Sequence, residues 1–250
     1  VRAMMDTWVN QTGYPVLSVQ VARGADGPVV AARQRRFLYE HVIDPKATDQ
    51  TLWHVPLSIG SANGSSPSPV LMDRAEAAVH LTGAYDPAGG WIKVNPGQTG
   101  FYRVDYGSEG WDSLIGAIQD LALPAVDRLG VQNDAYALSR AGMLPINTFL
   151  AIAQAYSNET DASVWEDLAG NLSGLDSLLA GEPLHAGFQR FARDVVGPAG
   201  ERIGWDAREG EGHLDSLLRS TVLSALGHYG DEAALAEVRA AVIVGRLGVD

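Results

Sequence analysis

The sequence predicts a multidomain β + α fold, in which an antiparallel β-sandwich is followed by an all-α helical solenoid of the HEAT/armadillo kind. Three observations lead to this prediction. Short runs of alternating apolar and polar residues fill residues 13–107. After Gly107 the apolar spacing becomes that of helices and stays so toward the C-terminal end. Short connections rich in Gly, Pro, Asp and Asn separate these helices, which is typical of stacked antiparallel helix pairs.

Composition narrows the class of protein. The chain has 250 residues, 46% hydrophobic and 19% charged, which suits one large globular domain or two smaller ones. A net charge of −12 disfavours nucleic acid as a partner, because phosphate binding needs clustered cations. Without cysteine there is no disulfide, thiolate metal site or cysteine nucleophile. That composition, and the lack of a visible signal peptide, favour the cytoplasm without establishing it. No run approaches the roughly 20 apolar residues that span a membrane.

The N-terminal part reads as one helix and then strands. Met4, Met5, Trp8 and Val9 have helical spacing within residues 1–11, and the chain starts at Val1 as if inside an amphipathic helix, which suggests a fragment of a longer protein. A turn at 24–28 makes a hairpin of the first two strands. We predict strands over residues 14–22, 29–40, 51–59, 69–72 and 77–82.

Residues 91–106 hold a strong turn signal. Asn95-Pro96-Gly97 separates two short aromatic runs, so we predict that 91–106 is the last hairpin of the sandwich. Lys93, Asn95 and Arg103 are interpreted as architectural residues, not ligand contacts. Gly107-Ser108 is then the exit into the first helix.

Helices follow with short connections. Gly142 suits a helix C-terminal cap, and Pro145 suits the first turn of the next helix. No sequence repeat of fixed period is visible, so any repeats are structural. The apolar spacing predicts helices over 109–122, 131–142, a stretch from Pro145, 161–180, 183–196, 211–228 and 231–244.

Motifs for catalysis are missing from this sequence. No Gly-x-Ser-x-Gly elbow, Walker loop or Gly-x-Gly-x-x-Gly is present, and Lys46 and Lys93 are the two lysines. No histidine lies four residues from another, so there is no helical zinc pair, and the pairs Glu182–His185 and Glu211–His213 are interpreted as chance. The six histidines are interpreted as solvated or hydrogen-bonded: His41, His54, His80, His185, His213 and His228.

Other polar and aromatic groups have competing interpretations. Arg33, Arg35 and Arg36 could bind an anion, but an exposed strand face or edge is favoured. Glu209 and Glu211 precede a helix and are expected to stabilise its N-terminus. Four aromatic residues could form a sugar platform, but a sandwich core is favoured for them: Trp53, Trp91, Phe101 and Tyr102.

Six stretches, in order, resemble the C-terminal half of the zinc aminopeptidases of the puromycin-sensitive, endoplasmic-reticulum and aminopeptidase N type. The most distinctive is WIKVNPGQTGFYRVDY (91–106), which is similar to the family pattern W-[IL]-K-x-N-x-x-x-x-G-[FY]-[FY]-R-V-x-Y. The others are WVNQTGYPVLSVQ (8–20), ARQRRFL (32–38), LWHVPLS (52–58), LGVQNDAYALSRAG (129–142) and ERIGWDAREGEGHLDSLLRSTVLSAL (201–226). Together they cover nearly the whole chain.

The resemblance implies an accessory region. In the family, a preceding catalytic domain carries H-E-x-x-H, a distal glutamate on zinc and a G-[AG]-M-E-N loop, and this sequence has neither motif. No catalytic, cofactor-binding or metal residue is therefore assigned here. Residues 1–12 would be the tail of that catalytic domain, 13–107 a β-sandwich linker, and 108–250 the first part of a helical bowl that encloses the peptide.

The implied partners are the protein's own N-terminal catalytic domain and peptide substrates, and zinc would belong to that domain. A rival hypothesis is a free-standing β-sandwich and α-solenoid scaffold that binds proteins or peptides with no peptidase attached. The coding sequence upstream of Val1 discriminates between them. H-E-x-x-H within a few hundred codons would exclude the scaffold, and an initiator methionine just before Val1 would support it.

Overall fold

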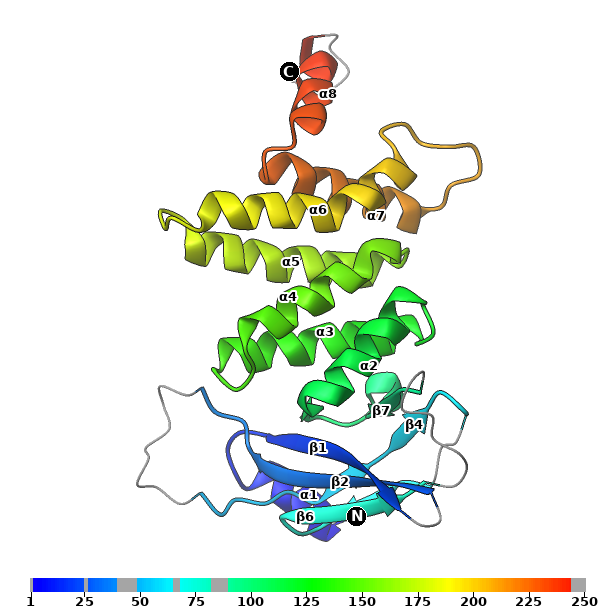
Figure 1. The fold of residues 1–250 in the computed structure, drawn as a ribbon, viewed down its shortest axis with the longest axis vertical. Coiled ribbons are helices and arrows are strands. Elements are labelled where there is room, and N and C mark those ends of the chain that lie inside the picture. The colour runs from blue at the N-terminus through cyan, green and yellow to red at the C-terminus, as the bar shows by residue number, and fades with distance from the viewer. Residues whose placement is uncertain (1, 25–26, 40–48, 65–67, 82–89, 244–250) are drawn as a thin grey trace. The chain divides into compact units, whose positions relative to one another are not determined.

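The computed structural model describes residues 2–24, 27–39, 49–64, 68–81 and 90–243. The predicted positions that fall elsewhere, His41 and Lys46 among them, lie outside the described residues. The described chain forms two compact units, Val1–Ala155 and Tyr156–Asp250. The first holds the described strands and helices α1 to α4, and the second holds α5 to α8 (Figure 1).

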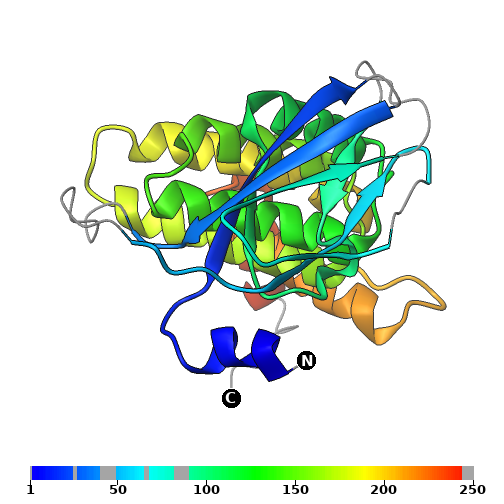
Figure 2. The same ribbon diagram turned by 90° about the horizontal axis from the view of Figure 1, so that it is seen from below.

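The first unit starts with α1 (Arg2–Val9) and the hairpin of β1 (Pro15–Gly24) and β2 (Gly27–Arg36), which the sequence predicted. β6 (Glu76–His80) pairs antiparallel with β2, and β8 (Arg103–Asp105) pairs with the other edge of β1. The order β6-β2-β1-β8 gives a four-stranded sheet, seen edge-on in Figure 1 and from below in Figure 2. Because β1 and β8 are parallel, the expectation of a wholly antiparallel arrangement is wrong for this pair.

Two smaller pairs complete the described strands. β3 (Val55–Leu57) pairs with β5 (Val70–Met72), and β4 (Ile59–Ser61) pairs with β7 (Ile92–Val94). The single strand predicted over 51–59 is thus two short strands in different sheets. The buried side chains that fill this part of the unit are almost all aliphatic or aromatic: Val16, Leu17, Val19, Val30, Trp53, Val55, Leu57, Ile59, Met72, Val94 and Val104.

The predicted hairpin at 91–106 is also wrong. β7 pairs with β4, whereas β8 pairs with β1, so the two strands on either side of the turn belong to different sheets. The turn itself is present and includes the short 3₁₀ helix η2 (Pro96–Gln98). The segment is therefore a crossover between sheets, and backbone pairing between its two arms is replaced by the polar contacts described below.

Three helices follow in the same unit: α2 (Gly107–Gln119), α3 (Ala125–Arg140) and α4 (Ile146–Ala155). α2 packs against β1 and β7, and α3 packs against β8 and η2. The predicted cap at Gly142 is confirmed, because this glycine has φ 76° and its N–H donates to the Ser139 carbonyl. Pro145, expected in the first turn of the next helix, directly precedes the first residue of α4, Ile146.

The second unit begins at η3 (Tyr156–Asn158), followed by α5 (Ala162–Leu179), α6 (His185–Ile203), α7 (His213–His228) and α8 (Glu232–Ile243). α5, α6 and α7 pack on one another. The Asp161 carboxylate caps α5 by accepting from the backbone N–H groups of Ser163 and Val164. The apolar core of this unit comes from Val164, Trp165, Leu168, Leu172, Phe188, Val195, Val196, Val222 and Leu226.

Candidate functional site

The turn after β7 is held by one asparagine side chain. Asn95 has left-handed backbone angles, as do Gly97 and Gln98 within the same turn. The Asn95 Oδ1 accepts from the Gly100 N–H at 2.7 Å, and its Nδ2 donates to the Gly100 carbonyl at 2.9 Å. The side chain thus closes the loop from Asn95 to Gly100 in the way that a pair of strand hydrogen bonds would.

Lys93 is buried just before this turn, with 1% of its surface exposed. Its Nζ donates to the Val94 carbonyl at 2.6 Å and lies 3.9 Å from the Asp127 Oδ1. Burial lowers the pKa of Lys93, and the charges of Asp134 and Asp127 oppose that shift. A buried ammonium with fixed acceptors fastens the backbone around it.

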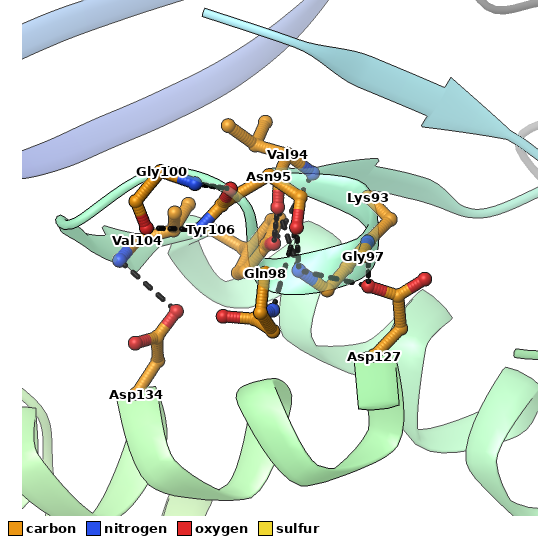
Figure 3. A network of polar contacts seen from close by, with 10 residues as sticks. All are labelled: Lys93, Val94, Asn95, Gly97, Gln98, Gly100, Val104, Tyr106, Asp127 and Asp134. Atoms are coloured by element: carbon orange, nitrogen blue, oxygen red, sulfur yellow. Dashed lines mark hydrogen bonds and ion pairs between the residues drawn. The ribbon is translucent and has the colours of Figure 1, made fainter. Parts of the chain in front are cut away.

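Two carboxylates on α3 accept hydrogen bonds from the turn and from the strand that follows it (Figure 3). Asp127 accepts from the Gly97 N–H at 2.7 Å, which binds the turn to the first turn of the helix. Asp134 accepts from the Val104 N–H at 3.2 Å and from Arg103 at 3.3 Å. Seven residues separate the two aspartates, which puts both on the same face of α3.

Burial raises the pKa of Asp134 to about 6, although the nearby charges of Lys93 and Arg103 act in the opposite direction. The effect of burial on the pKa of Asp134 is thus larger than the opposing effect of the two cations. Through its bonds to Arg103 and the Val104 N–H, the Asp134 carboxylate holds β8 against α3.

Tyr106 joins the other end of the segment to β7. Its hydroxyl accepts from the Val94 N–H at 3.2 Å and donates to the Val94 carbonyl at 3.1 Å. Its ring meets the Trp111 ring edge-on with 5.0 Å between centroids. Burial raises the pKa of Tyr106 well above its ordinary range. The tyrosine therefore supplies, through its side chain, the backbone partner that a hairpin would have given Val94.

We call Lys93, Asn95, Tyr106, Asp127 and Asp134 the polar joint. Each is nearly inaccessible to solvent, and each bonds to main-chain atoms of the crossover. A reactant has no access to these charges, so the arrangement suits fixing β7, the turn and β8 to α3, not catalysis. The interpretation of Lys93, Asn95 and Arg103 as architectural agrees with these contacts. Asp127 and Asp134 were not singled out from the sequence, although a buried lysine demands an acid and their spacing of seven was visible.

The histidines divide between the two units. The backbone of His54 accepts from the Trp8 Nε1 and donates to the Thr7 Oγ1, and His80 and His213 are exposed to solvent. In the second unit Asp176 lies between two histidines, with its carboxylate oxygens 2.8 Å from His185 Nε2 and 3.1 Å from His228 Nε2.

The pairs Glu182–His185 and Glu211–His213 do not form as side-chain pairs in the described chain. His185 contacts Asp176 instead, and Glu211 bonds to Arg219 at 2.6 Å. Across the described residues no group of three or more His, Cys, Asp or Glu side chains could hold a metal ion. The residues seen here thus do not fit a zinc site.

The arginines and aromatic residues keep mostly to the predicted roles. Arg33 pairs with Glu76 on an exposed strand face, and Arg36 pairs with Asp49 at 2.9 Å. Trp53 and Tyr102 are core residues. Phe101 is 70% exposed, so its predicted place in the core is wrong, because the crossover aims consecutive side chains to opposite sides and Tyr102 takes the inner one.

One cavity of about 1270 Å³ opens beside β1, β7 and the start of α2. Its described lining carries the carboxylates of Glu109, Asp112 and Asp120, together with the aromatic residues Trp91 and Tyr106 and with aliphatic and small polar residues. Histidine, lysine and arginine are missing from that described lining, so it offers neither a general base of the histidine type nor a cationic oxyanion group. Among the described helices, none combines the length and apolarity needed to cross a bilayer.

Comparisons with known proteins give the following similarities. The family model described as the ERAP1-like C-terminal domain matches residues 91–242. Aminopeptidase M1-A of Oryza sativa subsp. japonica is 35% identical over 242 residues, which are 95% of this chain and 26% of that protein. The puromycin-sensitive aminopeptidase of Caenorhabditis elegans is 30% identical over 93% of this chain and 24% of its own length. Glutamyl aminopeptidase of Rattus norvegicus is 29% identical over 89% and 23%. The chain spans about a quarter of the length of these relatives.

Proposed function

This chain belongs to the family of ERAP1-like C-terminal domains, and we propose that it is the accessory C-terminal region of a zinc-dependent aminopeptidase, which removes N-terminal residues from peptides. The observation that carries the proposal is the family match, which begins at Trp91, two residues before the first residue of the polar joint, and continues through the helices to residue 242. Relatives aligned to nearly the whole chain bear aminopeptidase names. We place the active site and its zinc in another part of the protein.

The domain division proposed for this region follows the change of secondary structure. Residues 13–107 would be the β-sandwich linker and 108–250 the start of a HEAT-like helical solenoid, with 1–12 as the tail of the preceding domain. The strands cease at Asp105 and α2 starts at Gly107, which supports a border there. The compact units divide later, at Ala155, because α2 and α3 pack against strands.

The proposed role is peptide enclosure and domain closure. The concave face of a helical solenoid provides a large space in which a ligand can be enclosed. Closure of such a space needs rigid bodies that move as wholes. The polar joint supports this, since it fastens α3 to the crossover through Asp127 and Asp134. We infer that α2, α3 and the strands move together.

The proposal is tested by assaying the purified 250-residue chain on an aminoacyl-arylamide with added zinc. We expect no turnover above the buffer blank, because the hydrolytic groups lie elsewhere. A Lys93→Met preparation purified in the same way serves as the control for contaminating peptidase. Turnover that follows the chain through purification and needs no other protein would contradict the proposal. Reading the coding sequence upstream of Val1 for H-E-x-x-H separates it from the free-standing scaffold.

A further inference from the structure

The edge of β1 that faces β8 is paired along only part of its length. β8 pairs with residues 16–18 of β1, and the ladder ends at Ser18 and Asp105. β1 itself continues to Gly24. Among the strands that the structure describes, none lies beside residues 19–24 on this side. A strand edge without a neighbour offers its N–H and C=O groups to another chain.

Val19 and Val21 present backbone groups to this open edge. Gly107 follows β8, on the side of β1 opposite β2, and a Cβ placed on Gly107 would lie 3.8 Å from the Val19 carbonyl oxygen. The Val19 carbonyl therefore points away from β2. The N–H and C=O of one strand residue point to the same edge, and this direction alternates along the strand. Val21 thus directs its N–H and its carbonyl to the open edge as well.

The end of β8 is fixed, so the edge stays open. Gly107 has φ 63°, a left-handed conformation, and there the chain leaves the sheet and enters α2. The Asp105 Oδ1 accepts from the Gly107 N–H at 3.2 Å and from the Trp111 Nε1 at 3.2 Å. Because the Asp105 carboxylate holds this turn, β8 cannot lengthen along β1 without breaking these bonds.

The open edge forms one wall of the cavity of about 1270 Å³. Residues 19–22 of β1 line it, as do Trp91, Ile92 and the start of α2. α2 packs against both β1 and β7 (Figure 1). The volume exceeds the roughly 300–1,000 Å³ of small-molecule pockets, so the cavity suits a segment of several residues.

The described lining of the cavity is acidic. Glu109, Asp112 and Asp120 of α2 line it and are exposed, and the described lining holds no Lys, Arg or His to offset them. None of the three carboxylates forms an ion pair with another described residue. Gly116 lies between them on α2, and a Cβ there would meet nothing within 4 Å. A long cationic side chain of a ligand therefore has both room and a charge to meet.

We propose that this cavity binds an extended peptide that carries Lys or Arg at alternate positions, and that the peptide adds a strand to β1 beside Val19 and Val21. In such strand addition the main-chain hydrogen bonds supply affinity and the side-chain contacts supply specificity. A second copy of this chain is a worse occupant, because its own edge would bring three more carboxylates into the cavity. The site is additional to the helical enclosure proposed above, and it does not rest on peptidase activity.

Binding of the blocked hexapeptide acetyl-Lys-Val-Lys-Val-Lys-Val-amide to the 250-residue chain tests the site. The acetyl group removes the free amino terminus, so that an aminopeptidase does not consume the peptide. Calorimetric titration should give saturable binding of one peptide per chain, with a Kd below about 1 mM that rises with salt concentration. The same peptide with Glu in place of Lys, and a version with methylated backbone nitrogens, should each bind at least about tenfold more weakly.

Two variants separate the strand edge from the charge. Val21→Pro removes an N–H that faces the open edge and leaves those that face β2, which is where strands tolerate proline, and it should raise the Kd at least about tenfold. The triple variant Glu109→Gln, Asp112→Asn and Asp120→Asn should do the same and remove most of the salt dependence. Glu166→Gln is the matched control, because Glu166 is exposed and lies in the other unit, and it should leave the Kd unchanged.

Hydrogen exchange of the unsubstituted chain, followed by NMR, reads the contact without any variant. Saturating peptide should slow exchange of the Val21 amide at least about tenfold, whereas the Gln20 amide, which faces β2, should change little. Absence of saturable binding, equal affinity for the Lys and Glu peptides, or binding without protection of the Val21 amide would each overturn the proposal. Protection of this amide in the free chain that increases with protein concentration would also overturn it and assign the edge to a second copy.

Discussion

The few buried residues of the polar joint stabilise the crossover between the sheets. A buried ammonium is stable only with fixed acceptors and nearby anions, and Lys93 has both in Val94 and Asp127. Oppositely charged side chains at the surface contribute little to stability, as in the exposed pair of Arg33 and Glu76. Burial, not charge, therefore decides which of these ion pairs matters.

Lys93→Met should destabilise the 250-residue chain by about 3 kcal/mol, because it leaves Asp127 and Asp134 buried with one cation fewer. Urea unfolding measures the change. Arg33→Met is the matched control, and about 0.5 kcal/mol or less is expected for its exposed pair. An equal effect of the two substitutions would show that Lys93 is solvated in the folded protein.

Asp134 should make stability depend on pH. Its folded pKa of about 6 lies above the ordinary 3.8, so the folded state binds more protons between these values. The contribution is complete below pH 3.8 and is lost as the pH rises through 6, by up to about 3 kcal/mol. Asp134→Asn removes this dependence, so the stability lost by the substitution should be smaller at pH 7 than at pH 4 by urea unfolding. A cost that grows toward pH 7 would mean that Asp134 is stabilised as the anion.

Phe101 and Tyr102 provide a test of which side of the crossover faces the core. Tyr102→Ala should cost about 3–5 kcal/mol, as truncations of buried aromatic residues do, and lower the melting temperature of the 250-residue chain clearly. Phe101→Ala should change the melting temperature by no more than a degree or two. Circular dichroism melting of the two variants side by side suffices. Similar losses from both would mean that Phe101 is buried.

Elements with clear apolar periodicity could be predicted from the sequence, and those with buried polar faces could not. The boundaries of α5, predicted as 161–180, and of α7, predicted as 211–228, agree with the structure to within two residues. α3 begins six residues before its predicted start, because its inner face carries Asp127, Arg128 and Gln132. Apolar spacing does not reveal a helix side that is buried through charges and amides.

The pairing of the strands also could not be predicted from the sequence. The turn at Asn95-Pro96-Gly97 was recognised, but a turn signal does not tell whether its arms pair with each other or with distant strands. Lys93, Asn95 and Arg103 are interpreted from the sequence as architectural, whereas Asp127 and Asp134, the partners of Lys93 and Arg103, lie more than 30 residues away in sequence. Contacts of that range follow from the three-dimensional arrangement, which local patterns do not contain.

The start of α5 offers a test at the level of one element. Asp161 accepts from two backbone N–H groups, so Asp161→Ala should cost about 1 kcal/mol. Asp161→Asn keeps an acceptor and should cost a few tenths. Urea unfolding followed by circular dichroism at 222 nm compares them. Equal losses from the two substitutions would assign the effect to charge at the helix N-terminus in place of the hydrogen bonds.

At the scale of the whole molecule, the chain forms two compact units. It matches a family model over residues 91–242, and its relatives are about four times as long as the part that aligns with it. Within the described residues, buried contacts of the polar joint fasten the crossover to α3 and so hold strands and helix together. This is why we propose an accessory role for the chain and propose that hydrolysis is carried by another part of the protein.

Peptide hydrolysis by the whole gene product, with and without residues 13–250, tests this assignment most directly. Both proteins are assayed on a peptide of about ten residues and on an aminoacyl-arylamide. The accessory role predicts that removal of the region lowers kcat/KM for the peptide at least about tenfold, because enclosure of the peptide is lost. Peptide hydrolysis at an unchanged rate by the shortened protein would contradict it.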